Sequence, residues 1–274
     1  MTVEASGDLG LGAWRRDPGT VVRRDVGLPL GDPVPAAILA ESETPGAATE
    51  WEPHTHPVDE LVWVRGGTMT SRIGNRLFTV PAGSGLWLPA GTVHGGRVTA
   101  GAELHYAFFA LGRAPAVFRG PALVTITPLL DALLVRLARR DLEVGERERT
   151  EAVVFDVLEP AGRQFALDLP GDSRIDVIAE ALLSDPADRR GLEEWADQLG
   201  VSDRTITRAF QSATGLSFAQ WRQALRVHRA LALLAEGSDV RDVAERLGYA
   251  QPSTFIAAFR RVLKVTPGAL AKRG

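Results

Sequence analysis

The sequence contains no cysteine, and no apolar run approaches the roughly 18 residues that suggest a membrane-spanning helix. The lack of cysteine excludes disulfides, iron–sulfur clusters and metal sites built from thiolates. The N-terminus also lacks the basic and apolar regions of a signal peptide. We therefore expect a cytoplasmic protein without a membrane partner, and 274 residues are enough for one or two domains with cores of their own.

Positive charge is not in excess over the whole chain, but it is concentrated at the C-terminal end. The formal net charge is −3, whereas residues 201–274 contain twelve Arg and Lys side chains against five Asp and Glu. A local basic surface is what contact with DNA phosphates requires, whatever the charge of the whole chain. The alternative is a solvated charged face.

Two helix-turn-helix patterns in tandem, at residues 192–210 and 240–259, are the most informative feature of the chain. In the first, apolar residues at positions 192, 195, 196 and 199 form one stripe of a helix. Gly200 suits a left-handed corner, and Ser202 is a good N-cap for the next helix. That helix is expected to bury Ile206, Ala209, Phe210 and Ala213. The outer face, whose two arginines are our first choices for reading guanine, consists of Arg204, Thr207, Arg208 and Gln211.

The second pattern has its apolar stripe at positions 240, 243, 244 and 247, its corner at Gly248 and Pro252 in the first turn of the next helix. The inner face of that helix is expected to be Phe255, Ala258, Phe259 and Val262. Its outer face is short and weakly polar, so we expect it to contribute phosphate and thymine-methyl contacts more than specificity. The candidate residues are Ser253, Thr254, Ala257, Arg260 and Arg261.

A long helix is predicted between the two patterns, because Ser217 and Gln220 form a capping box at the start of residues 218–235. At 1.5 Å per residue this helix would be about 27 Å long, which could hold two recognition helices about one DNA turn apart. Arg222, Arg226 and Arg229 share one face of it. Two interpretations of these arginines stay open, contact with phosphates and a solvated stripe.

The segment from about residue 192 to 270 resembles the AraC/XylS family of transcriptional regulators. The pieces that carry the resemblance are Thr214-Gly-Leu-Ser-Phe, Leu225-Arg-Val-His-Arg-Ala-Leu-Ala-Leu-Leu, Val243-Ala-Glu-Arg-Leu-Gly-Tyr, Ser253-Thr-Phe-Ile-Ala-Ala-Phe-Arg-Arg and Val265-Thr-Pro-Gly. The resemblance implies a sequence-specific module of seven helices, the first at 174–184, with double-stranded DNA as partner. His228 falls in a packed helix of that pattern, where we expect a structural histidine.

The N-terminal part consists of short apolar segments separated by glycine and proline, which indicates an antiparallel β-sandwich or barrel. The expected strands include 34–40, 61–64, 77–80, 85–88 and 104–111, and the expected turns are 66–67, 74–75, 81–83, 89–91 and 95–96. We expect the first 20 residues to be poorly ordered.

Three of the five histidines lie near one carboxylate in this part of the sequence. The i, i+2 spacing of His54 and His56 puts both rings on one face of a strand, Glu60 follows a turn, and His94 comes later. Imidazole and carboxylate are ligands for divalent cations. The expected metal ligands are therefore His54, His56, Glu60 and His94.

The patterns His54-x-His56-x3-Glu60-x6-Gly67 and Gly83-x5-Pro89-x-Gly91-x2-His94 resemble the two signatures of the cupin superfamily. The resemblance implies a small β-barrel with the four ligands converging inside it. Two positions that are not ligands depart from the signatures, Ala48 in place of glycine and Val98 in place of asparagine.

We expect this barrel to bind a divalent ion, zinc or nickel first, then manganese, iron or cobalt. The alternative is a metal-free barrel that binds an organic effector. Strand alternation lets only about half of the nearby aromatic and histidine side chains line the cavity. These side chains are Trp51, Trp63, Trp87, His105, Tyr106 and Phe108.

Residues 126–171 are expected to be linker and dimerisation helices. Leucines at 129, 130, 133, 134 and 137 recur at helical spacing, a second helical stretch covers 151–158, and the proline- and glycine-flanked segment 162–171 is typical of a linker. The helices are expected to form the seam of a homodimer, as in similar regulators. The alternative is that they cover the open edge of the barrel.

The expected fold is therefore α+β with two domains: an N-terminal cupin β-barrel (1–125), linker helices (126–171) and an all-α domain with two helix-turn-helix units (172–274). The expected function is a sequence-specific transcription regulator, and not an enzyme, whose barrel senses a divalent metal or a small-molecule effector. Two other functions stay open. One is a cupin-type metalloenzyme, a dioxygenase or isomerase, fused to a DNA-binding domain. The other is a nucleoid-type DNA binder without a sensor.

Overall fold

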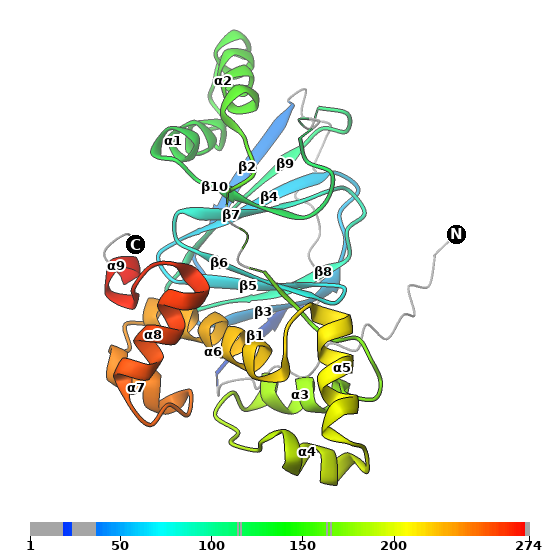
Figure 1. The fold of residues 1–274 in the computed structure, drawn as a ribbon. Helices are drawn as coiled ribbons and strands as arrows, with labels where there is room; N and C mark the ends of the chain where they lie inside the picture. Colours follow the sequence, from blue (N-terminus) through cyan, green and yellow to red (C-terminus); the bar gives the residue numbers. More distant parts are fainter. Residues whose placement is uncertain are drawn as a thin grey trace.

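The computed structural model describes residues 19–23, 37–113, 115, 117–162, 164 and 166–271. A β-rich half made of two sheets is followed by a helical half that lies against one of them (Figure 1), which confirms the predicted α+β architecture. The expectation of disorder in the first 20 residues falls mostly on residues outside the described ranges, as does the beginning of the strand expected at 34–40.

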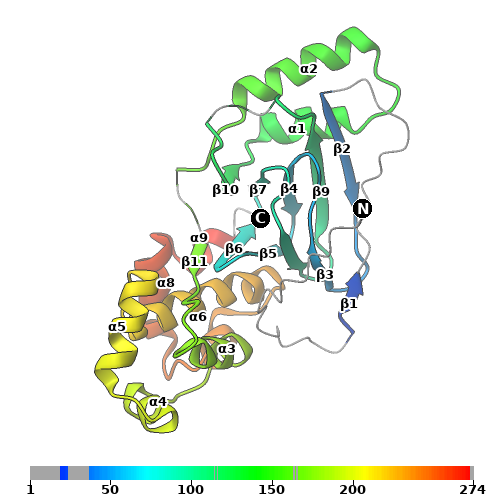
Figure 2. The same ribbon diagram turned by 90° about the vertical axis from the view of Figure 1, so that its right-hand side faces the viewer.

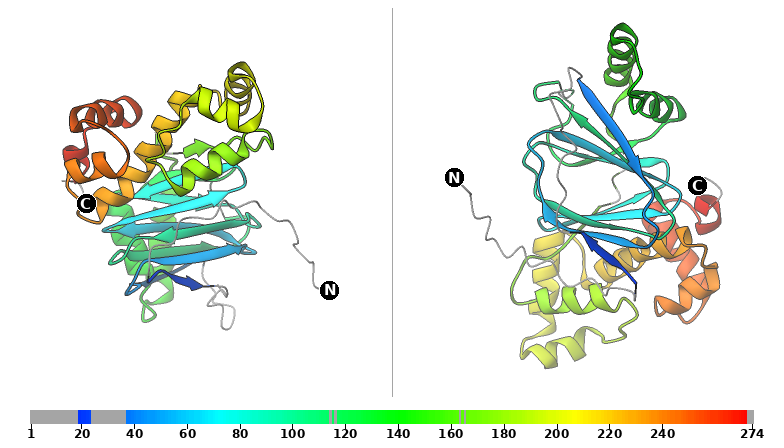
Figure 3. Two further views of the ribbon diagram at one scale, coloured as in Figure 1. Left: turned by 90° about the horizontal axis from the view of Figure 1, so that it is seen from below. Right: turned by 180° about the vertical axis from the view of Figure 1, so that it is seen from behind.

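The two sheets face each other and form the barrel (Figure 3). All pairings are antiparallel except that of β1 with β3. In order, the first sheet contains β1 (Val21–Arg23), β3 (Thr49–His54), β8 (His94–Val98), β5 (Thr68–Ile73), β6 (Arg76–Pro81) and β11 (Ala166–Asp168). The second contains β10 (Ala122–Thr125), β7 (Ser84–Leu88), β4 (Asp59–Arg65), β9 (Glu103–Phe109) and β2 (Ile38–Glu43).

Strand β4 is apolar on both faces because both faces are covered. Val62 and Val64 belong to the core cluster between the sheets, whereas Leu61 and Trp63 belong to a second cluster on the outer face. The helices α1 (Pro128–Leu137) and α2 (Val144–Val157) cover that outer face. The continuous apolar run at 61–64 is the sequence signature of a strand buried on both sides.

The α1–α2 pair therefore covers the outer face of the second sheet, whereas the alternative interpretation placed such a cover over the open edge of the barrel. Leu130, Leu134 and Leu137 are buried against the sheet, and Thr127 Oγ1 accepts the N–H of Leu130 at 3.1 Å to cap α1. Helix α2 begins at Val144, before the predicted start at 151. The prediction missed its first two turns because the charged segment 144–150 has no apolar periodicity. A role in dimerisation is compatible with this cover and stays a prediction.

The prediction of a turn at 95–96 is wrong. Gly95 and Gly96 lie inside β8, between β3 and β5. A Cβ at Gly95 would lie 3.1 Å from the carbonyl oxygen of Trp51, and one at Gly96 would lie 3.0 Å from that of Thr70. The glycines are needed for close approach of neighbouring backbones and not for a turn.

The helical half consists of seven helices in the described chain, as the family resemblance implied. They are α3 (Asp176–Ser184), α4 (Leu192–Leu199), α5 (Asp203–Thr214), α6 (Phe218–Ala235), α7 (Val240–Arg246), α8 (Pro252–Leu263) and α9 (Pro267–Ala271). The predicted caps are present: Gly200 has a φ of 64°, Ser202 Oγ accepts the N–H of Thr205, and Ser217 and Gln220 form the capping box. One inward assignment is wrong, because Ala213, near the end of α5, is exposed.

The segment expected as a linker, 162–171, contains a strand. Within it, β11 pairs with β6 and extends the first sheet, and Trp221 of α6 donates its Nε1–H to the carbonyl of Asp168 at 2.8 Å. The connection between the two halves is therefore fixed to both of them. In the part of the chain that the structure describes, no helix is both long enough and apolar enough to cross a membrane.

Candidate functional site

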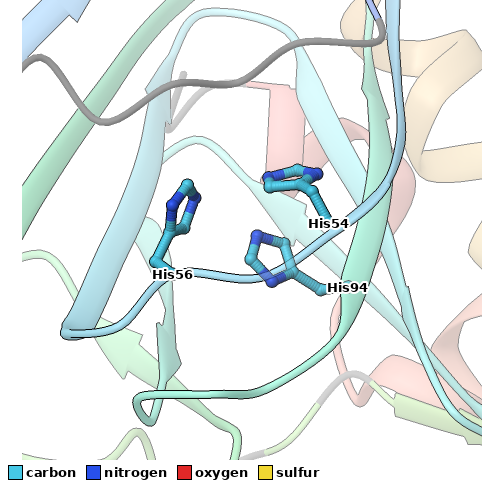
Figure 4. Close-up of side chains that lie close together, drawn as sticks. All are labelled: His54, His56 and His94. Carbon is cyan, nitrogen blue, oxygen red and sulfur yellow. The ribbon is translucent and has the colours of Figure 1, made fainter. Parts of the chain in front are cut away.

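Three histidines meet inside the barrel (Figure 4). His54 is the last residue of β3, His56 lies in the loop that follows, and His94 begins β8, where its Cα pairs with that of His54. Their ligand nitrogens all lie within 4.8 Å of one another. The expectation that His54 and His56 share the face of one strand is wrong, since the strand ends at His54, but the two rings still meet with centroids 5.0 Å apart.

Two of these rings are oriented by backbone carbonyls. His54 Nδ1 lies 2.7 Å from the carbonyl oxygen of Glu52, and His94 Nδ1 lies 2.9 Å from that of Thr92. A carbonyl oxygen only accepts, so each Nδ1 carries the hydrogen and each Nε2 keeps a free lone pair. Such carbonyl contacts at Nδ1 are typical of histidines that bind metal through Nε2.

A carboxylate from the opposite sheet joins the cluster. Glu60 is in β4, and its Oε2 lies 3.6 Å from His56 Nε2 and 3.4 Å from His94 Nε2. That oxygen is buried and makes no hydrogen bond. Buried polar atoms are nearly always satisfied, so this one indicates a missing partner.

Burial shifts the protonation equilibria of the cluster in opposite directions. It raises the pKa of Glu60 to about 8 and, with the neighbouring His54, lowers the pKa values of His56 and His94 to about 4. The imidazoles are therefore neutral at pH 7, the form that binds a cation, whereas Glu60 is largely protonated at that pH and would release its proton on binding one. Three imidazoles and one carboxylate fit the divalent ions that were expected from the sequence.

A cavity of about 180 Å³ adjoins the cluster. Trp51, Tyr106 and Phe108 line it, whereas Trp63, Trp87 and His105 do not, which confirms the expectation that about half of this set points inward. Among the lining residues that sequence reasoning missed are two charged ones that no motif marks, Arg23 of β1 and Glu43 of β2, whose side chains form an ion pair at 2.6 Å. The cavity thus combines aromatic walls, the histidine cluster and one ion pair.

The two candidate recognition helices, α5 and α8, lie on the same side of the helical half, with α6 behind them (Figures 1 and 2). On α5, all four predicted DNA-contacting residues are exposed, although Gln211 donates its side-chain N–H to the carbonyl of Gly215 at 2.9 Å. On α8, all five are exposed as well. Ile256, which was not predicted, is 37% exposed on the same helix.

Two of the three arginines of α6, Arg222 and Arg226, fit neither of the two interpretations that the sequence left open. Arg222 and Arg226 are half-buried and donate to backbone carbonyls of residues 186–190, ahead of the first motif. Spacing on one helix face could not identify these partners, which come from a different part of the chain.

Comparison with known proteins identifies the family. Residues 195–273 match a family described as "Helix-turn-helix domain", and residues 42–109 match "Cupin domain". The HTH-type transcriptional regulator NimR of Escherichia coli K12 is 34% identical over 223 residues, which cover 78% of this chain and 80% of NimR. This chain is an AraC-type transcriptional regulator with an N-terminal cupin domain.

The regulator is also similar to the HTH-type transcriptional regulator RipA of Corynebacterium glutamicum, with 34% identity over 209 residues that cover 76% of the regulator and 60% of RipA. Among solved structures, ToxT from Vibrio cholerae O395 is similar over 86% of the regulator and 96% of its own chain, with 12% identity and a TM-score of 0.37. The family assignment therefore rests on the sequence relatives.

Proposed function

We propose that the cupin barrel of this regulator binds a divalent cation through His54, His56, Glu60 and His94, and that occupancy of this site controls binding of DNA. The single observation that carries the proposal is the unpartnered buried oxygen of Glu60, 3.4 Å from His94 Nε2 within a cluster of neutral imidazoles. A cation held there by neutral imidazoles and one carboxylate would offer its remaining coordination positions to a small effector in the adjoining cavity.

The four donors come from both sheets, since Glu60 lies on β4 and the histidines lie on or beside β3 and β8. A cation held by all of them would connect the two sheets across the barrel interior. Its binding would therefore stabilise one arrangement of the sheets relative to each other, which is how a ligand shifts a conformational equilibrium.

For the helical half, we propose that Arg204 and Arg208 read bases from α5, and that Ser253, Thr254 and Ala257 contact bases from α8. Thr207 and Gln211 complete the outer face of α5, and Arg260 and Arg261 contact the DNA backbone. Support comes from their exposure and from the position of α5 and α8 on the same side of the helical half (Figure 2). Zinc and nickel stay the first candidates for the metal.

We also propose that the regulator acts as a homodimer through the outer surfaces of α1 and α2. Leu129, Val135, Val144 and Val153 are large apolar side chains that stay exposed there, with exposed fractions of 54%, 38%, 70% and 39%. The proposed function includes no reaction catalysed by the barrel. Incubating the metal-loaded barrel with small-molecule substrates would support an enzyme if it produced catalytic turnover.

The decisive experiment measures metal content and DNA binding on the same sample. Full-length protein purified without a histidine tag is analysed for metals, stripped with a chelator, and titrated with zinc or nickel while its affinity for a selected DNA site is followed. We expect about one cation per chain and a change in DNA affinity on removal. A folded protein that binds no cation, or whose DNA affinity is indifferent to the cation, contradicts the proposal.

A further inference from the structure

A short segment ahead of the first helix-turn-helix motif, residues 185–190, contacts both motifs and the helix between them. At its end, the Arg190 guanidinium lies over the Trp195 ring, 3.6 Å from its centroid, and donates from Nη1 to Gln198 Oε1 at 2.7 Å. Both partners belong to α4. This end of the segment is therefore fixed to the first motif.

The spacer helix α6 binds the same segment through its arginines. Arg226 donates from Nε to the carbonyl of Pro186 at 2.7 Å and from Nη2 to that of Asp188 at 3.1 Å. Arg222 donates from Nη1 to the carbonyl of Arg190 at 2.8 Å. The planar guanidinium of Arg226 holds two carbonyls in one fixed geometry, whereas a lysine would present its donors from a single flexible point.

The opposite side of the segment contacts the corner of the second motif. Gly248 has a φ of 74°, and a Cβ there would lie 2.9 Å from the carbonyl oxygen of Ala187. The Arg226 guanidinium also lies 5.4 Å from the ring of Tyr249, the residue that follows this corner. Residues 185–190 therefore form a wedge between the two motifs.

We propose that Arg226 is a positioning residue which, through this wedge, fixes the separation and tilt of α5 and α8 and thereby determines the half-site spacing that one subunit accepts. The inference rests on the proposal that α5 and α8 both contact DNA. The helix α6 fixes the distance between the two motifs at its ends. It does not fix the tilt of the second motif, which depends on further contacts. The wedge supplies such a contact, and Arg226 holds it in place.

Binding to DNA sites of altered spacing tests this role. The full-length protein selects its best site from random DNA, and duplexes are then made with one base pair added or removed between the two half-sites. One base pair moves a half-site by about 3.4 Å and rotates it by roughly a tenth of a turn, so we expect wild type to lose at least about tenfold in affinity. For Arg226→Ala we expect weaker binding at the native spacing but little further loss at the altered ones.

Two variants make the comparison specific. Arg226→Lys keeps the charge without the planar guanidinium, so we expect its loss of affinity at altered spacings to lie between those of wild type and Arg226→Ala. It replaces Arg226→Ala in the comparison if circular dichroism shows that Arg226→Ala is unfolded. Arg260→Ala is the matched control, because loss of a phosphate contact weakens binding by a similar factor at every spacing. The same uniform loss in Arg226→Ala and Arg226→Lys, or no change in either, overturns the proposal.

The underlying proposal fails in a different way. If wild type itself tolerates changed spacing and keeps its affinity when the second half-site is randomised, α8 does not read DNA. That result is visible before any variant is made, and it overturns the positioning role as well.

Discussion

His228 Nδ1 and Thr79 Oγ1 lie 2.7 Å apart in a buried hydrogen bond that joins the spacer helix α6 to strand β6 of the barrel. A second contact runs beside it, from Thr68 Oγ1 of β5 to the carbonyl oxygen of Leu231 at 3.4 Å. The barrel thus docks directly on the helix that separates the two DNA-reading motifs. Strand β5 connects this junction to the cavity, since Met69 lines the cavity while Thr68 faces α6.

Replacing Thr79 by valine is expected to weaken communication between the two halves. The substitution leaves His228 Nδ1 without its buried partner, which lowers the free energy of unfolding by about 1–3 kcal/mol. We expect the metal-dependent change in DNA affinity to shrink while metal affinity, measured by calorimetry, stays within about twofold. Thr125→Val, on the exposed side of β10, is the control that should leave both unchanged. An undiminished metal response in Thr79→Val contradicts this route.

The burial of His228 is expected to make the protein less stable as the pH falls below neutrality. Burial lowers its pKa in the folded state from 6.5 to about 4. Below pH 6.5 the unfolded ring takes up a proton and the folded ring does not until about pH 4, so the free energy of unfolding falls across this window as the pH falls. The loss is at most about 1.4 kcal/mol per pH unit.

Urea unfolding between pH 4 and 8 measures this effect when wild type is compared with His228→Gln. The comparison is needed because the cluster histidines also have lowered pKa values and add to the wild-type slope. We expect the variant to lose stability less steeply below pH 6.5. Parallel curves for the two proteins are the contrary result.

Glu60→Met separates a metal ligand from a structural residue. Glu60 is a buried carboxyl whose Oε2 has no hydrogen-bond partner, so an apolar side chain of similar size should leave the metal-free protein equally stable or more stable. We expect zinc or nickel to stabilise wild type by about 2.7 kcal/mol at a hundredfold excess over Kd and so to raise its melting temperature, and we expect the variant to lose this rise. Differential scanning fluorimetry with and without metal measures both.

Glu151→Met is the matched control for this substitution. Glu151 is also buried, but its Oε1 accepts the backbone N–H groups of Ala37 and Ile38 at 3.0 and 3.1 Å. Its replacement should lower stability by about 1–3 kcal/mol and keep the metal response. A Glu60→Met protein that is destabilised yet still stabilised by metal would contradict the ligand assignment.

Arg208→Ala is expected to lower affinity for the selected DNA site by about 1–3 kcal/mol, roughly 5- to 150-fold, and to relax the base preference at one position. Thr254→Ala on α8 should cost less, since its outer face is less polar. Arg140→Ala, a side chain that is 89% exposed beyond α1, is the control without effect. Electrophoretic mobility shifts on matched and mutated sites measure these differences, and equal behaviour of Arg208→Ala and Arg140→Ala would reject α5 as a reading helix.

Leu130 and Leu129 of α1 allow the inner face, which covers the barrel, to be tested separately from the outer face, which is proposed to form the dimer. Leu130 is fully buried, so Leu130→Ala should lower the free energy of unfolding by about 2–5 kcal/mol. Leu129 is 54% exposed, so Leu129→Ser should leave the stability of one subunit within about 0.5 kcal/mol and weaken the dimer. Sedimentation measures the second effect, with the exposed Val177→Ser on α3 as control. Unchanged association in Leu129→Ser would remove this surface from the dimer.

The helical half was largely predictable because its signals are local. Ser202, Ser217 and Gly200 mark helix ends within one turn of the chain, and each occupies the expected cap. The clustering of His54, His56 and His94 was also predictable, since short spacings and the cupin resemblance bring them to one place, whereas their role as metal ligands stays a prediction. Strand β3 was missed as an element because its sequence, Thr49–His54, is mostly polar.

Contacts between distant segments left no local signal. The partners of Arg226 lie about forty residues upstream, and the partner of His228 lies in the barrel. A helix face can indicate that a side chain is half-buried, but it cannot say against what. The two Gly residues at 95–96 were misread for the same reason, because the strands that crowd them are distant in sequence.

The unlike outer faces of α5 and α8 have a consequence for gene arrangement. The proposed base-reading positions are arginines on α5 but small hydroxyl and methyl groups on α8, so the two ends of a single subunit differ along the duplex. A binding site inverted with respect to the promoter would present the barrel to the opposite side. If α5 and α8 read DNA as proposed, the direction of the binding site therefore determines which side of the bound subunit faces the promoter.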